Sequence, residues 1–190
     1  MHSKYSTGSP EFDRYLGGVR AGDSLLIFQT NARESQPLLR ILLDHIRQED
    51  LSLFYLNLTG SRDLLISGIR CRNMQPPGPT RNRRSGLQRW ITCRLKELKP
   101  GEVFLFDDLA DWKDALGGEE ALVRVFSIVS LAVQKKKGFL ITTALRSAFE
   151  KPTLASLKES SSICLDLSSH GGDLLLMPLN LRGRYFSGPA

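Results

Sequence analysis

Cysteine and histidine are scarce in this sequence. Its 190 residues include three cysteines, Cys71, Cys93 and Cys164, with no CxxC pair, and three histidines with no HExxH or HxxxH pair. This scarcity excludes a disulfide scaffold and a cysteine-based zinc site, and we expect no bound metal. Unpaired cysteines are typical of a reducing compartment, so we expect an intracellular protein, either cytoplasmic or nuclear.

Long hydrophobic runs are also missing. No apolar stretch reaches the roughly 18 residues that a membrane span needs. The N-terminal MHSKYSTGSPEF lacks the apolar core of a signal peptide. With 41% hydrophobic and 24% charged residues, the chain suits one domain over residues 1–190 and no membrane partner.

The net charge of +6 is distributed unevenly. Residues 61–100 carry ten Lys or Arg and two acids, whereas the other 150 residues carry 16 basic and 18 acidic side chains. A near-neutral protein therefore contains one segment of net charge +8. At its centre, residues 71–86 are rich in Pro, Gly, Asn and Arg and poor in apolar side chains, which predicts an exposed, flexible basic loop.

Along most of the chain, short apolar runs alternate with segments whose apolar residues recur at helical spacing. We expect strands at 24–28, 51–58, 102–106 and 139–143, helices at 37–48, 63–69, 87–98 and 119–137, and a hairpin from 162–167 and 173–178. This order predicts an α/β fold. A mainly parallel central sheet would carry helices on both faces and a C-terminal antiparallel hairpin at its edge.

The helix expected at 119–137 is apolar around most of its circumference. A helix that only covers a sheet keeps one polar face, so part of this one is buried either by another subunit or domain, or within the domain itself. The lysines 135–137 fit a helix C-terminus. We expect Cys93 and Cys164 in the core and Asp111 and Asp114 in a solvated loop.

The segment STGSPEFDRYLGGVRAGDSLLIF (6–28) resembles the entry segment of the RecA superfamily, most of all its KaiC-like branch, S-T-G-[IV]-P-x-L-D-x-L-L-G-G-G. The strand at 103–106, which ends in Asp107, resembles a Walker B strand. Asn180-Leu181-Arg182-Gly183 resembles the K-x-R-G turn, whose Lys and Arg reach toward the nucleotide of the next subunit in that family. The resemblance implies a RecA-like fold and a homo- or hetero-oligomer of RecA-like subunits.

The sequence departs from the family pattern at the residues that bind the phosphates of the nucleotide. The phosphate loop G-x-x-G-x-G-K-[ST] should follow Ile27, but this chain has no glycine and no lysine there, and Glu34 would repel phosphate. The glycines allow successive backbone N–H groups to converge on a phosphate, and the lysine neutralises the phosphate charge. The degenerate nucleotide site comprises Gln29, Ala32, Arg33, Glu34, Ser35, Gln36, Asp107 and Arg182.

These losses predict a pseudo-ATPase without catalytic residues or cofactor. The family's general-base glutamate is replaced by Thr59-Gly60, and the lysine of the K-x-R-G turn by Asn180. Asp107 and Asp108 either hold magnesium or form a polar strand end. In the first case a neighbouring subunit would complete a weak ATPase.

The basic segment provides the alternative anion site. In RecA-like rings, segments near this part of the chain often face the channel through which DNA or RNA passes. Arginines bind phosphate through paired hydrogen bonds, and an aromatic ring stacks on a base. The candidate residues are Arg72, Arg81, Arg83, Arg84, Arg89 and Trp90; alternatively, the segment is a solvated linker or docks on an acidic partner.

The sequence therefore favours a non-catalytic RecA/KaiC-like binding or assembly module, with nucleic acid as one candidate ligand. The Elongator accessory subunits and the non-catalytic RecA paralogues are comparable proteins. The alternatives are an ATP-binding protein completed by a neighbour and a regulatory scaffold without ligand.

Overall fold

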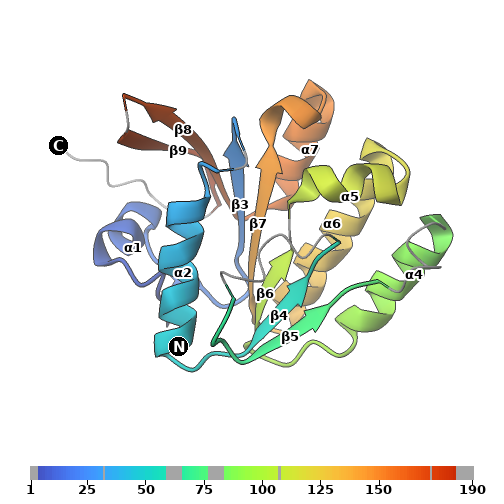
Figure 1. Cartoon of the computed structure of the whole chain (residues 1–190), viewed down its shortest axis with the longest axis horizontal. Helices are drawn as coiled ribbons and strands as arrows, with labels where there is room; N and C mark the ends of the chain where they lie inside the picture. The colour runs from blue at the N-terminus through green and yellow to red at the C-terminus, as the bar shows by residue number, and fades with distance from the viewer. Residues whose placement is uncertain are drawn as a thin grey trace.

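A twisted central sheet organises the molecule (Figure 1). The computed structural model describes residues 4–31, 33–58, 66–76, 84–106, 108–171 and 173–182. Within these ranges the sheet has seven strands in the order β5-β4-β6-β7-β3-β8-β9, all parallel except β9, which pairs antiparallel with β8. The strands are β3 (Ser24–Gln29), β4 (Leu53–Leu56), β5 (Cys71–Met74), β6 (Val103–Phe106), β7 (Phe139–Leu145), β8 (Ile163–His170) and β9 (Asp173–Leu181).

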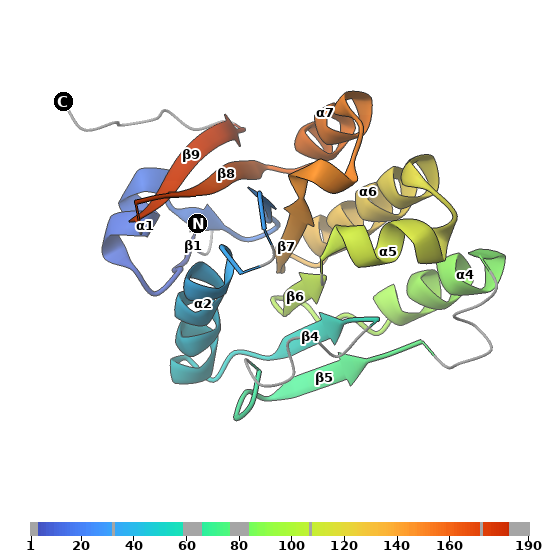
Figure 2. The same ribbon diagram turned by 45° about the horizontal axis from the view of Figure 1, so that its top comes forward.

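Helices cover both faces of this sheet (Figures 1 and 2). Helices α1 (Pro10–Leu16) and α2 (Gln36–Gln48) lie on one face, beside a small ladder of β1 (Lys4–Tyr5) and β2 (Val19–Arg20). The other face carries α4 (Arg84–Leu95), α5 (Leu109–Leu116), α6 (Glu119–Lys135) and α7 (Lys151–Ser160), with the short helix η1 (Arg146–Ala148) after β7.

Two apolar cores follow from the alternation of side chains along the strands. In β3, Leu25 and Ile27 pack toward α1 and α2, whereas Leu26 and Phe28 pack toward α4–α7. Strands buried on both sides are continuous apolar runs, as expected for a parallel sheet. The predicted fold class is confirmed, including both helix layers and the C-terminal hairpin.

The family-like entry segment has a local physical explanation. Ser9 caps α1 by accepting a hydrogen bond from the Phe12 N–H, and Asp13 accepts from the Thr7 N–H at 2.8 Å. Gly8 has φ of +86°, and a Cβ there would lie 2.6 Å from the His45 Cβ on α2. Only glycine therefore lets this turn approach α2 so closely.

The structure corrects the expectation of one long basic loop. Cys71–Met74 form the edge strand β5 beside β4, and Arg84 already begins α4. The rest of the expected loop, 77–83, lies outside the described residues, as do 63–65 of the short helix expected at 63–69, whose last part is a turn at 66–68.

Helices α1, α5 and α7 are additional to the predicted elements. Asp111 and Asp114 lie in α5 and not in a solvated loop, because Asp108 caps that helix by accepting from the Ala110 N–H at 3.0 Å. Cys93 is exposed, contrary to expectation, since the buried stripe of α4 passes through Leu87 and Ile91. Cys164 is buried as predicted, and burial raises the pKa of its thiol to about 12.

Helix α6 is only partly covered. Leu122, Val125, Phe126, Val129 and Val133 are buried against the sheet and α7. Ile128 and Leu131 remain 48% and 49% exposed. Within the described ranges, no helix is both long enough and apolar enough to span a bilayer.

Candidate functional site

The segment predicted to be a degenerate phosphate loop lies at the carboxyl edge of the parallel strands. Strand β3 ends at Gln29, and residues 30–35 lead into α2 at Gln36. Asp108 follows β6 at the same edge. Open α/β sheets bind their ligands at this edge, beside the loops that leave the strands. The sequence motif and the topology therefore identify the same place.

Glu34 folds back onto this loop and fills it with its own carboxylate. Its Oε2 accepts from the Thr30 N–H at 2.8 Å and the Asn31 N–H at 3.3 Å. Its Oε1 accepts from the Thr30 hydroxyl at 2.7 Å and from the Ser169 hydroxyl of β8 at 3.0 Å. All four donors are neutral. The loop thus holds an anion through hydrogen bonds alone, and that anion belongs to the chain.

The electrostatics of Glu34 follow from these bonds. The residue is 6% exposed, and burial by itself would raise the carboxyl pKa. The Thr30 hydroxyl bond is the largest influence and lowers it, helped by the Thr30 N–H, the Ser169 hydroxyl and the Asn31 N–H, so that the pKa falls to about 2. Glu34 is therefore ionised at neutral pH.

Gln29 connects β3 to the corner after β6. Its Nε2 donates to the Asp108 Oδ2 at 2.8 Å, while the other carboxylate oxygen of Asp108 caps α5. The Gln29 Oε1 is fully buried and has no hydrogen-bond partner among the described residues. Asp108 therefore directly follows β6 and caps α5. Asp107 lies outside the described residues.

The remaining predicted nucleotide-site residues differ in their exposure to solvent. Ser35 precedes α2 with a buried hydroxyl that has no partner within the described ranges, and Arg33 and Gln36 are exposed. Ala32 lies outside the described residues. The described part of the chain contains no group of three or more His, Cys, Asp and Glu side chains suited to a metal ion.

Arg182 lies at the opposite edge of the sheet. Its backbone N–H donates to the Ser162 carbonyl at 2.9 Å, and its guanidinium donates to the Glu159 carbonyl. Ser162 in turn bonds Ser24, the first residue of β3. The length of β3, about 17 Å at 3.3 Å per residue, therefore separates Arg182 from the loop after Gln29. Within the chain, Arg182 and this loop therefore do not meet.

Two of the predicted nucleic-acid residues are engaged within the fold. Arg72 forms an ion pair with Glu102, whose side chain is 1% exposed, and stacks over the Phe54 ring at 4.8 Å. Trp90 is half-buried against the core, with the Arg94 guanidinium 5.8 Å from its ring centre.

The other members of that set are less constrained or lie beyond the description. Arg89 is exposed. Arg81 and Arg83 lie outside the described residues, and Arg84 is described only through its backbone at the start of α4. The structure therefore leaves Arg89 as the described, solvent-facing member of the predicted nucleic-acid set.

Sequence reasoning missed two functional partners, Ser169 and Glu102. Ser169 is 135 residues from Glu34 along the chain, so no local pattern indicates that pair. Glu102 does carry a signal, since an acid directly before a buried apolar strand needs a buried partner.

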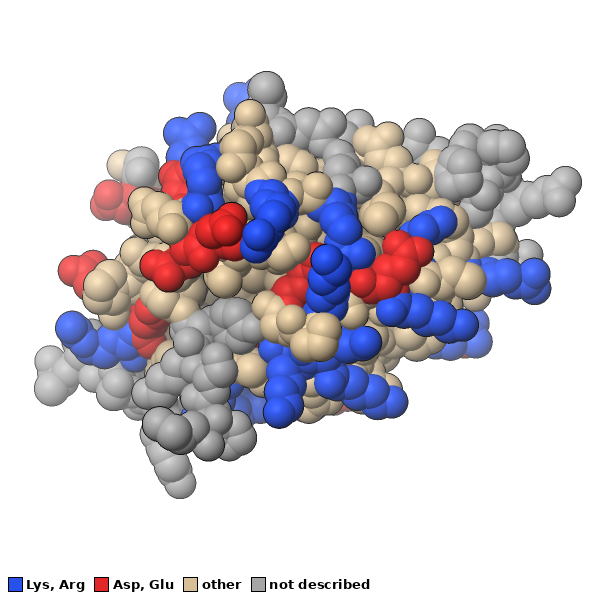
Figure 3. Space-filling view, turned by 90° about the horizontal axis from the view of Figure 1, so that it is seen from below, with Lys and Arg blue, Asp and Glu red and all other residues tan. Residues whose placement is uncertain are grey.

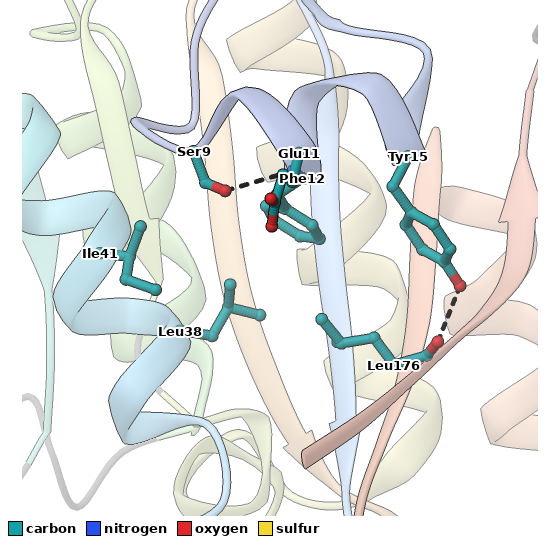
Figure 4. A pocket seen from close by; sticks show the side chains of 7 residues that line it. All are labelled: Ser9, Glu11, Phe12, Tyr15, Leu38, Ile41 and Leu176. Carbon is teal, nitrogen blue, oxygen red and sulfur yellow. Dashed lines mark hydrogen bonds between the residues drawn. The ribbon is translucent and has the colours of Figure 1, made fainter. Parts of the chain in front are cut away.

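A second hollow, of about 360 Å³, lies between α1, α2 and β9 (Figure 4). Phe12, Leu38 and Leu176 form its apolar wall. The Tyr15 hydroxyl donates to the Leu176 carbonyl at 2.7 Å and ties the hairpin to α1. Burial raises the pKa of Tyr15. Among the residues that the structure describes, no predicted site residue lines this hollow.

Comparison with known proteins supports the fold. No protein-family model and no curated protein matches the chain. A KaiC-like protein from Pyrococcus horikoshii OT3 aligns with a TM-score of 0.66 and 14% identity over 96% of this chain and 90% of that one. The flagellar accessory protein FlaH from Methanocaldococcus jannaschii aligns with a TM-score of 0.63 and 16% identity over 95% and 88%.

The fold is RecA/KaiC-like. Identities of 14% and 16% establish this architecture alone. In the RecA/KaiC-like arrangement, the loop between β3 and α2 is where the family's phosphate motif would lie, and here Glu34 occupies it.

Proposed function

We propose that this chain is a non-catalytic RecA/KaiC-like binding or assembly module that works as part of an oligomer. The internal carboxylate of Glu34 carries the proposal. A bound phosphate would need the same N–H and hydroxyl donors that Glu34 uses. It would also bring a second anion beside an ionised carboxylate in a buried position, where repulsion between like charges is strong.

The end of β3 supports the same conclusion. Gln29 donates its side-chain amide to Asp108, so this carboxylate already has a hydrogen-bond donor on each oxygen. An acid committed to capping a helix is a poor magnesium ligand, because the ion would have to displace both donors. The proposed role is therefore to bind partners through surfaces, without nucleotide turnover.

Calorimetric titration with ATP and Mg²⁺, together with a phosphate-release assay, tests this proposal. We expect no saturable heat and no release above the protein-free rate. Micromolar ATP binding, or turnover that Asp107→Ala abolishes, would overturn it in favour of an ATPase completed by a neighbour. Asp114→Ala is the matched control, since Asp114 is an exposed acid on α5. Light scattering gives the oligomer mass, and a strictly monomeric chain would contradict the assembly role.

Contact with nucleic acid is a second proposal, favoured by the distribution of charge. Lys and Arg side chains gather, with a few acids between them, on the face seen from below (Figure 3). Helices α2, α4 and α6 end on this side, where cations also interact favourably with the helix dipoles.

The basic segment supplies the residues for this test. DNA and RNA affinities are measured against salt for the wild type and for a variant with Arg81, Arg83 and Arg84 changed to Ala. A second variant changes the exposed Lys96, Lys99 and Lys135, at or just beyond the ends of α4 and α6, to Ala. Counterion release predicts weaker binding at higher salt and a shallower slope in each variant. An absence of salt-dependent binding would contradict this second proposal.

A further inference from the structure

Helices α4 and α6 enclose a groove on the outer face of the molecule. Its volume is about 420 Å³. Buried Ile91 and Val125 contribute to its apolar lining, and Arg89 of α4 and Arg124 of α6 line it as exposed cations. The half-exposed Ile128 lines the same groove. This surface is separate from the phosphate loop, which lies at the carboxyl edge of the sheet.

A single stripe of α6 continues the groove. Arg124, Ile128, Leu131 and Lys135 are spaced i, i+4, i+7 and i+11, which places them on one side of a helix. All four are exposed. The stripe therefore presents two apolar side chains in its middle and a cation at each end. An apolar centre within a charged rim is the usual anatomy of a protein interface.

The charges around this stripe have a dominant sign. The exposed cations are Arg124 and Lys135 on α6, Arg89 on α4 and Lys96 in the turn that follows α4. One acid on this side, Glu120, lies 3.5 Å from Arg124, but both side chains are largely exposed, so the pair is weak. A second acid, Glu97, is paired with Arg94. The surface is thus complementary to an acidic partner.

We propose that the α4–α6 face docks an acidic amphipathic helix of another protein. Two neighbouring apolar side chains of that helix would cover Ile128 and Leu131, and its Asp or Glu side chains would lie opposite Arg89, Arg124 and Lys135. Binding of a helix in a groove through anchors three or four residues apart is an established mode of recognition. The inference rests on the proposed role as a binding module and specifies the partner.

A second copy of the chain fits this surface poorly. If two α6 helices packed antiparallel about a two-fold axis, Ile128 and Leu131 would meet their counterparts. Arg124 would then face Lys135 of the other copy, and like charges in a forming interface oppose association. The same cations favour a partner that carries acids at these positions.

A displayed library of random peptides provides the probe. It is selected on the wild-type protein and counter-selected on the double variant Ile128→Ser with Leu131→Ser. We expect the enriched peptides to combine acidic residues with a pair of apolar residues at helical spacing. Their binding is then measured by the emission of a fluorophore on Cys93, which is exposed on α4.

Two variants separate the apolar and the electrostatic contributions. The Ile128→Ser and Leu131→Ser pair should weaken peptide binding at least about tenfold, as expected when central apolar anchors are lost. The matched control, Ile41→Ser with Leu175→Ser, removes equally exposed apolar side chains from α2 and β9 and should leave binding unchanged. Arg89→Glu with Arg124→Glu should weaken the binding of the acidic peptides and strengthen the binding of versions that carry Lys in place of Glu.

Several outcomes would overturn the proposal. These are a selection that enriches no acidic amphipathic peptide, or peptides that bind the Ile128/Leu131 variant as well as the wild type. A dimer that dissociates in this variant would assign the face to a second copy. Duplex DNA binding that is lost in the Arg89/Arg124 variant, without peptide binding, would assign it to nucleic acid. ATP titration tests the underlying non-catalytic role, so the two proposals can fail separately.

Discussion

Two buried carboxylates, Glu34 and Glu102, lie at opposite edges of the sheet and are satisfied in different ways. Glu34, at the carboxyl edge, is held by neutral hydroxyl and backbone donors alone. Glu102, at the amino edge, is held by the guanidinium of Arg72, the Ser52 hydroxyl at 2.8 Å and the Lys99 N–H at 2.9 Å.

The difference separates an anion site from a structural clamp. A carboxylate with its own cation is neutral as a unit and binds one strand to another, here β5 to the start of β6. A carboxylate without a cation, surrounded by converging donors, occupies a place that can accept any small anion of similar size. In the loop between β3 and α2, the chain's own Glu34 carboxylate occupies that place.

The largest expected effect is on the clamp. Arg72→Met removes the cation and leaves Glu102 buried with two neutral donors, which should cost about 3 kcal/mol of unfolding free energy by urea denaturation. Adding Glu102→Leu should recover part of this loss, because two apolar side chains replace the pair.

Arg70→Met is the control for this change. Its pair with Asp50 is exposed on both sides, so the loss should stay below about 0.5 kcal/mol. Equal losses for Arg70→Met and Arg72→Met would remove the distinction between a buried clamp and a surface pair.

A smaller effect is expected in the loop. Glu34→Ala leaves the Thr30 and Asn31 N–H groups without an acceptor, at a cost of about 2 kcal/mol. The vacancy should then bind sulfate, so that sulfate at constant ionic strength raises the melting temperature of the variant by mass action. The wild type should not respond. An equal response in both proteins would contradict the idea that Glu34 occupies an anion site.

The sheet could be predicted from the sequence because its central strands are short, continuous apolar runs, which are typical of strands buried on both faces of a parallel sheet. Strand β5 could not, since CRNM has no apolar alternation and is held by pairing with β4 and by Arg72 to Glu102 across 30 residues. The absence of the pattern G-x-x-G-x-G-K-[ST] after Ile27 can be recognised from the local sequence. The set of donors around Glu34 cannot, because Ser169 approaches from the far end of the chain.

The pH dependence of stability tests the contribution of the ionised Glu34 carboxylate. The pKa of Glu34 lies near 2 in the fold, against an ordinary value of 4.5. A lowered folded pKa means that the stabilisation is fully present above pH 4.5 and is lost as pH falls from 4.5 toward 2. The stability difference between wild type and Glu34→Gln, from urea midpoints, should shrink across that window. A difference that stays constant there would show that the Glu34 charge makes no contribution.

The smallest effect should come from Ser169→Ala. This change removes one of four neutral donors to Glu34 and leaves three in place, so the cost should be about 1 kcal/mol or less. Because this bond joins the phosphate loop to β8, the loss should be local, and amide exchange should rise at the tip of the β8–β9 hairpin before the core strands respond. Ser168→Ala is the matched control, one residue earlier and on the other face of the strand. An equal increase in amide exchange in both variants would show that the Ser169–Glu34 hydrogen bond does not connect the loop to β8.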